Sequence, residues 1–139
     1  MTWIIYALFS AFFAALVAIF GKIGISNIDN TLATTVRAFI MFLFLGGISL
    51  YLGVFNKLNQ IDSKALTFIA LSGVAGALSW LCYFYALRKG PPAGVAAIDR
   101  LSVVFVLILS VIFLSQSLNL KTILGALLIT AGAILFALN

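Results

Sequence analysis

The sequence is poor in the side chains that most enzymes use for chemistry. Its 139 residues include no histidine and no glutamate, and the acids are Asp29, Asp62 and Asp99 alone. One cysteine, Cys82, excludes an intrachain disulfide and a thiolate metal cluster. Acid–base chemistry would therefore rest on one or two carboxylates. These absences argue against an enzyme, and we expect no catalytic residue, no metal and no cofactor.

Charge is scarce as well. Only 8% of the residues are charged, against about 25% in an average soluble domain. The eight Lys and Arg residues give a net charge of +5 but are scattered singly, so they form no basic patch and predict no nucleic-acid partner. Hydrophobic residues reach 65%, and the 11 glycines raise this share to roughly 73%, where an average domain has about 45–50% with glycine included. The composition excludes a soluble globular domain and indicates a multi-pass membrane protein, with the lipid bilayer as its surroundings.

Five apolar runs account for most of the chain. Each is long enough to cross a bilayer as a helix. No Lys or Arg precedes the first run, so we interpret it as a span and not as a signal peptide. The sequence predicts an all-α integral membrane protein, a single membrane domain over residues 1–139. Its five transmembrane helices, joined by short loops, are expected at about 3–20, 32–55, 65–87, 93–114 and 121–138.

The loop cations are balanced between the two sides of the membrane. Five spans place the termini on opposite sides, so three cations fall on each side: Lys57, Lys64 and Lys121 with the N-terminus, and Lys22, Arg88 and Lys89 opposite. The positive-inside rule then favours neither orientation. This balance favours dual topology, in which copies insert both ways. The alternative is a weak bias with a single orientation.

Polar residues inside the predicted spans indicate a candidate site. An ionisable residue at the centre of a span costs about 2.5–3.5 kcal/mol on insertion scales and marks a functional site by default. Arg37 and Asp99 are expected about 8–10 Å below the same membrane surface, where they could pair, and Trp80 and Tyr83 lie near the same surface in their own helix. Ser102 follows Asp99 by three residues and could orient its carboxylate. The alternative is a structural ion pair between two helices.

Small residues suggest where helices approach closely. Gly125 and Gly132 lie seven residues apart in the last predicted span, so they share one helix face. Such a face permits close helix packing. The spacing does not distinguish packing within the chain from packing in a dimer.

The ordered set of motifs resembles the EamA-type module of the drug/metabolite transporter superfamily, in its single-module form. The resemblance rests on residues 78–85 (Leu-Ser-Trp-Leu-Cys-Tyr-Phe-Tyr), on Ile98-Asp99-Arg100-Leu101-Ser102, and on the stretch from Gly125 to Gly132. It implies half of an inverted-repeat, ten-helix assembly, which an antiparallel homodimer would rebuild. Two departures stand out. Ser115-Gln116 replaces the usual Gly-Glu, and residues 3–20 lack the glutamate of small multidrug resistance proteins.

These observations lead to one functional hypothesis and its rivals. We expect a small-metabolite transporter that works by alternating access as an antiparallel homodimer. Its substrate and coupling residues would be Asp99, Arg37, Trp80, Tyr83 and Ser102. Because the spans hold two Arg and one Asp, an anionic or zwitterionic small-molecule substrate is favoured over a cation. The alternatives are a half-module or accessory membrane subunit that needs a different partner protein, and a passive channel.

Overall fold

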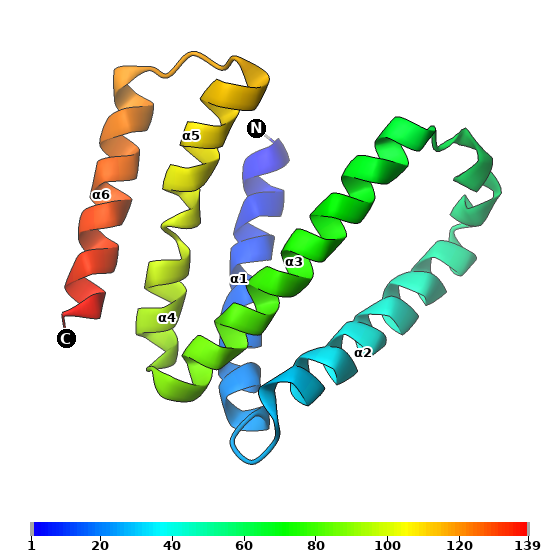
Figure 1. The fold of residues 1–139 in the computed structure, drawn as a ribbon, viewed down its shortest axis with the longest axis horizontal. Coiled ribbons are helices and arrows are strands. Elements are labelled where there is room, and N and C mark those ends of the chain that lie inside the picture. Colours follow the sequence, from blue (N-terminus) through cyan, green and yellow to red (C-terminus); the bar gives the residue numbers. More distant parts are fainter. Residues whose placement is uncertain (1, 139) are drawn as a thin grey trace. The chain divides into compact units, whose positions relative to one another are not determined.

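The computed structural model describes residues 2–138, and these residues are mostly helical, with no strand among them. Five stretches are long and apolar enough to cross a membrane, and α4 and α5 together form one of them. The prediction of an all-α membrane protein is confirmed. In chain order the elements are α1 (Thr2–Gly24), α2 (Asn30–Tyr51), the 3-10 helix η1 (Val54–Gln60), α3 (Ser63–Lys89), α4 (Pro92–Asp99), α5 (Ser102–Leu114) and α6 (Leu120–Ala137) (Figure 1).

The chain divides into two compact units. The hairpin unit is Ile23–Arg88, and the terminal unit joins Met1–Lys22 to Lys89–Asn139. The hairpin unit contains α2, η1 and α3, whereas the terminal unit contains nearly all of α1 together with α4, α5 and α6. That residues 1–139 act as one membrane domain stays a prediction.

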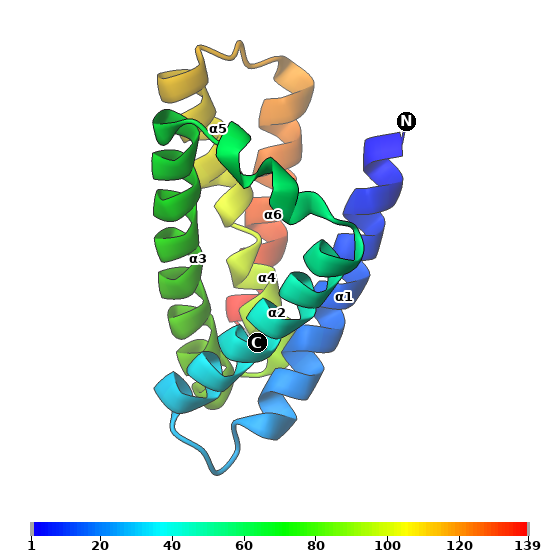
Figure 2. The ribbon, with the colours of Figure 1, turned by 90° about the vertical axis from the view of Figure 1, so that its right-hand side faces the viewer.

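The hairpin unit is an antiparallel helix pair whose two helices begin at side-chain caps. Within it, α2 and α3 run in opposite directions and η1 connects them (Figure 2). The Asp29 carboxylate accepts from the backbone N–H groups of Thr31 and Leu32, at 2.8 and 3.0 Å, and so caps α2. Asp62 caps α3 in the same way, accepting from the Ala65 N–H at 2.7 Å. Each carboxylate satisfies N–H groups that a helix start leaves unpaired.

In the terminal unit, α6 packs against α4 and α5. Both pairs are in contact, and α6 runs back along the α4–α5 span (Figure 1). A Cβ built on Gly94 of α4 would lie 3.7 Å from the Phe136 carbonyl oxygen of α6 and 3.3 Å from Cγ of Pro91. Gly94 therefore lies at the contact between α4 and α6, where a Cβ would touch the α6 backbone and a larger side chain would have to displace it. At the end of α1, Lys22 Nζ donates to the Gly90 carbonyl oxygen at 2.9 Å.

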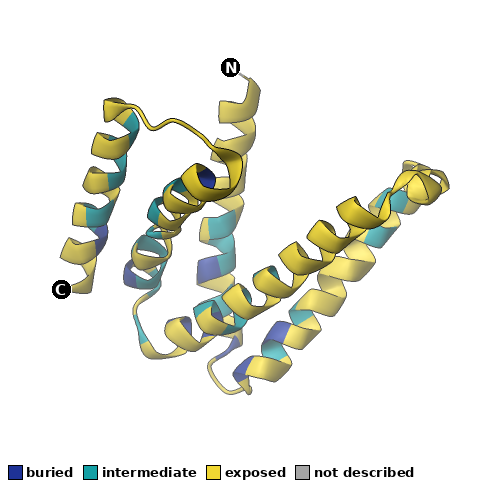
Figure 3. Ribbon diagram, turned by 45° about the horizontal axis from the view of Figure 1, so that its top comes forward, coloured by how far each residue is buried: buried dark blue, intermediate teal, exposed yellow. Residues whose placement is uncertain are grey.

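Most large apolar side chains of the described residues are exposed (Figure 3). In a water-soluble protein such a surface would be rare. In a bilayer it is the expected lipid-facing surface, because lipid tails are as apolar as the side chains themselves. The buried hydrophobic residues are few, namely Ala18, Ile25, Phe84, Leu87 and Ala133.

One predicted helix end is wrong, and one predicted span contains two helices. The second span ends at Tyr51 and not at residue 55, because Gly53 adopts a left-handed conformation, with φ of 64°, and η1 follows. The fourth span, predicted over 93–114, is found at Pro92–Leu114, but its helix is interrupted between Asp99 and Ser102. There the N–H groups of Arg100 and Leu101 bond to carbonyls three residues earlier, at 3.2 and 2.9 Å. The interruption coincides with polar residues, of which Asp and Ser have low helix propensity.

Candidate functional site

Arg37 lies on α2 with its guanidinium against an aromatic ring of α3. It is seven residues past Asn30, the first residue of α2, so it lies about 10 Å along the helix axis from that end. Its Cζ is 3.5 Å from the centroid of the Trp80 ring and 5.5 Å from that of Phe84. Both separations fall within the range of a cation–π interaction. The contact therefore joins α2 to α3 across the hairpin unit.

The aromatic residues come from one face of α3, because residues 80, 83 and 84 follow the i, i+3, i+4 spacing of a helix. The Trp80 and Tyr83 rings are edge to face, with centroids 5.5 Å apart, and the Tyr83 and Phe84 rings are edge to face at 6.3 Å. Trp80 and Phe84 lie tilted at 5.8 Å. Such aromatic pairs stabilise one another beyond their area of contact. We call Arg37, Trp80, Tyr83 and Phe84 the Arg37 cluster.

Within the hairpin unit, the guanidinium of the Arg37 cluster lies against aromatic rings. Among the described residues of that unit it has no ion pair and no hydrogen bond, and its side chain is only half-buried. Stacking occupies the face of the guanidinium plane, whereas its five N–H donors lie along the edge. Those donors match the two oxygens of a carboxylate or phosphate group, which guanidinium binds in bidentate fashion. The cluster is therefore suited to hold an anionic group.

Three of the predicted site residues lie together in this cluster. Arg37, Trp80 and Tyr83 were expected near one membrane surface, and in the structure Trp80 contacts both Arg37 and Tyr83. Phe84 is the cluster residue that the sequence reasoning missed. It is buried, with 3% of its surface exposed, and its position one turn after Trp80 was the available signal. The roles of these residues in the protein stay predictions.

The other two predicted site residues, Asp99 and Ser102, lie at the helix interruption of the terminal unit. Asp99 is the last residue of α4 and Ser102 the first of α5. Both are exposed. Within the described part of the chain, no hydrogen bond joins their side chains, so an orienting role for Ser102 stays a prediction. Asp99 and Arg37 belong to different units, and their pairing also stays a prediction.

The two glycines predicted to permit close packing face open space. A Cβ on Gly125 or Gly132 would meet nothing within 4 Å. Within the residues that the structure describes, the close approach occurs at Gly94 instead. Packing of Gly125 and Gly132 against a second molecule stays a prediction.

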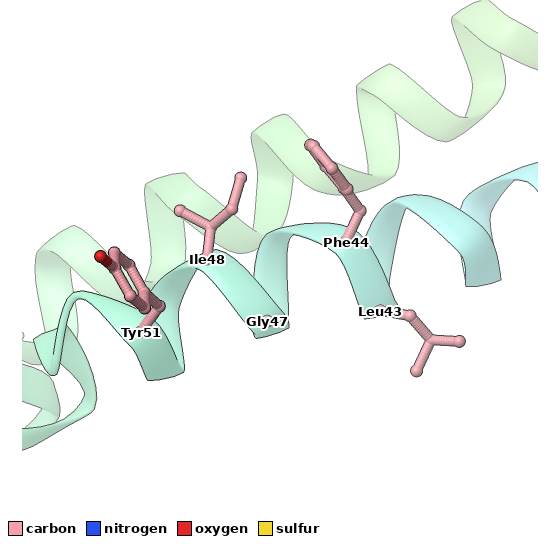
Figure 4. A pocket seen from close by; sticks show the side chains of 5 residues that line it. All are labelled: Leu43, Phe44, Gly47, Ile48 and Tyr51. Carbon is pink, nitrogen blue, oxygen red and sulfur yellow. The ribbon is translucent and has the colours of Figure 1, made fainter.

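The surface hollows of the helices are apolar and differ in character from the Arg37 cluster. One hollow of ≈410 Å³ lies along α2, where Gly47 leaves a gap between larger side chains (Figure 4). Its lining holds one polar side-chain group, the Tyr51 hydroxyl. Such a hollow lacks the convergent polar groups that orient a metabolite. Its lining residues are Leu43, Phe44, Gly47, Ile48 and Tyr51.

Comparison with known proteins identifies a family of membrane transporters. The family model described as "EamA-like transporter family" matches residues 1–138. A Sinorhizobium protein named as an uncharacterized transporter in the cobO 3' region is 43% identical over 136 residues, which cover 98% of this chain and 96% of that protein. An uncharacterized protein of Methanocaldococcus jannaschii is 32% identical over 67% of the chain and 70% of its own length.

A more distant relative is larger. The pseudopaline exporter CntI of Pseudomonas aeruginosa is 31% identical over 92 residues, which are 61% of this chain but 32% of the exporter. No solved structure matches the chain.

Proposed function

Because the chain belongs to the EamA-like transporter family, we propose that it moves a small anionic or zwitterionic metabolite across the inner membrane by alternating access. Membership of the family, together with five spans of sufficient length, makes the protein a multi-pass membrane transporter. The class of substrate, the membrane and the working assembly are the proposed part. The relative named as an exporter supports movement of a small solute.

The guanidinium of Arg37, stacked on Trp80, is the observation that supports an anionic or zwitterionic substrate. A cation inside a span is costly unless it faces a cavity or a partner. Here Trp80 lies 3.5 Å away, and a ring offers a face to the cation without neutralising its charge. A carboxylate or phosphate of the substrate would supply the missing negative charge and accept hydrogen bonds from the guanidinium edge. Trp80 and Tyr83 would line the same site with ring surface.

Asp99 is proposed to couple transport to an ion. It is the one carboxylate inside the spans, and the interruption that separates α4 from α5 follows it directly. Interrupted helices expose backbone groups at substrate and ion sites of many transporters. Its immediate neighbour Arg100 is exposed as well, so the charge balance at the interruption depends on both residues. In proteoliposomes, Asp99→Asn should lower the flux and flatten its pH dependence, and an unchanged profile would remove Asp99 from the mechanism.

The working unit is proposed to be an antiparallel homodimer. Balanced loop cations allow both insertions, and two inverted copies would form the ten-helix architecture that inverted repeats provide in larger transporters. The exposed polar residues Asp99 and Ser102 support a partner molecule, because exposure of a charge to lipid is costly. Gly125 and Gly132 would permit close packing at such an interface.

Ligand binding tests the substrate class directly. The purified chain in detergent is screened by thermal shift against dicarboxylates, sugar phosphates, amino acids and organic amines. Ligands with a carboxylate or phosphate should stabilise the protein, and Arg37→Gln should abolish the shift. Lys64→Gln is the matched control, since it also removes one cation but lies in the first turn of α3, outside the cluster. Stabilisation by amines alone would refute the proposal.

Topology tests the assembly. Reporter tags at the C-terminus, read separately from each side of the membrane, should report both orientations in comparable amounts. A single orientation would exclude the antiparallel homodimer. It would favour the second candidate, a half-module or accessory membrane subunit that works only with a different partner protein.

A further inference from the structure

The side chains of η1 fall into distinct rows. A 3-10 helix has three residues per turn, so residues three apart lie above one another. Phe55, Leu58 and Ile61 form an apolar row, and Asn56 and Asn59 begin a polar row beside it. Ile61 follows the last residue of η1, but its N–H still donates to the Leu58 carbonyl oxygen at 3.2 Å. The apolar row therefore continues through Ile61.

The apolar row is not covered by the rest of the chain. Phe55, Leu58 and Ile61 are 43%, 55% and 41% exposed. Water would make such a row unfavourable, since full burial of each of these side chains contributes about 1.5–3 kcal/mol relative to full exposure, and about half of each stays exposed. Another medium must cover the row, and the position of η1 in the chain identifies that medium.

The position of η1 is set by the two spans it joins. It begins three residues after the end of α2 and ends three residues before the start of α3. Neither end of η1 can therefore lie far from the membrane surface. The left-handed Gly53 turns the chain out of the direction of α2 before η1 begins. Tyr51, 91% exposed, is the last residue of α2, where aromatic side chains favour the headgroup level.

We propose that η1 lies flat in the membrane interface, with the row Phe55, Leu58 and Ile61 inserted at the boundary between headgroups and acyl chains. Amphipathic helices in this position bury their apolar face by about 5–10 Å. Lys57 within η1 and Lys64 just beyond it face the headgroup region, where anionic lipid attracts cations. The partner of this surface is the bilayer. The placement does not depend on which solute the protein carries.

Site-directed spin labelling tests the proposal on the full chain. In a Cys82→Ser background, single cysteines are introduced at each position from 54 to 61, labelled and reconstituted into vesicles of neutral and anionic phospholipids. Collision rates with oxygen, which concentrates in the bilayer, are compared with those of a water-soluble nickel complex. The ratio of the two rates should be several-fold higher at 55, 58 and 61 than at 56 and 59.

The two rows control for each other, because labels on neighbouring residues of one short helix share its fold and its vesicles. Equal access of the nickel complex to all positions would overturn the proposal in favour of a loop in water. Exclusion of both reagents from 55, 58 and 61 would overturn it in favour of protein covering the row. Loss of the period of three would overturn the helical arrangement on which the inference stands.

Discussion

The contact between Arg37 and Trp80 should be measurable as a coupling energy. A cation–π pair contributes about 0.5–1 kcal/mol when exposed and about 2 kcal/mol when desolvated. Arg37 is half-buried and its Cζ lies 3.5 Å from the Trp80 centroid, so the expected coupling is about 1–1.5 kcal/mol. The Phe84 ring at 5.5 Å retains part of the interaction when Trp80 is removed, which keeps the estimate at the lower end.

A double-mutant cycle isolates that energy. The free energy of unfolding of the full chain in detergent micelles is measured for the wild type, Arg37→Met, Trp80→Leu and the double variant. Methionine keeps most of the apolar stem of arginine and removes its charge. The two single losses should exceed the double loss by about 1 kcal/mol, which is roughly a fivefold change in the unfolding equilibrium constant.

A matched cycle controls for general effects. Tyr85 lies on the opposite face of α3 and is 48% exposed, so Arg37→Met and Tyr85→Leu should be additive. The stability changes caused by mutations at independent sites add to within about 0.3–0.5 kcal/mol. A coupling between Arg37 and Trp80 no larger than that of the control pair would refute the stacked arrangement, and with it the support for an anion site.

Three further predictions concern helix ends and helix packing, each measured as a change in thermal unfolding of the purified chain. Asp29→Ala should destabilise α2 by about 1 kcal/mol, because two backbone N–H groups lose their acceptor, whereas Asp29→Asn should retain most of the cap; equal losses would refute capping. Gly94→Leu should cost about 1–3 kcal/mol through overpacking, whereas Gly73→Leu, where nothing lies within 4 Å, should cost far less. Lys22→Met should cost about 1 kcal/mol through loss of the hydrogen bond to Gly90, and Lys22→Arg should restore part of it; no difference between the two would contradict a role for that bond.

Much of the fold follows from composition and local chemistry. A run of about 20 apolar residues can cross a bilayer as a helix, because a helix pairs the backbone N–H and C=O groups that lipid cannot satisfy. The five spans were therefore predictable from residue types alone. Local chemistry also accounts for the start of α2, where the Asp29 side chain caps the helix. Trp80 and Tyr83 share a helix face because their spacing demands it.

Other features depend on which helices meet. The stacking of Arg37 on Trp80 is a contact between residues 43 positions apart, and no local spacing encodes it. The sequence reasoning did not foresee that the Arg37 guanidinium lies against rings of α3, and its pairing with Asp99 stays a prediction. Gly94 rather than Gly125 or Gly132 lies against the backbone of a neighbouring helix, because the registry of two helices decides which glycine meets a backbone.

The sequence by itself thus determined that the protein is a membrane protein and that it crosses the bilayer as helices. It also named the few polar side chains inside the spans as candidates for a site, which stays a prediction. Each of these conclusions rests on the free energy of one residue or one segment in lipid. Only the tertiary structure decided how Arg37 is held and where the fourth span is interrupted. Those features arise from contacts between helices and from the balance of i→i+3 and i→i+4 hydrogen bonds, which single-residue preferences do not resolve.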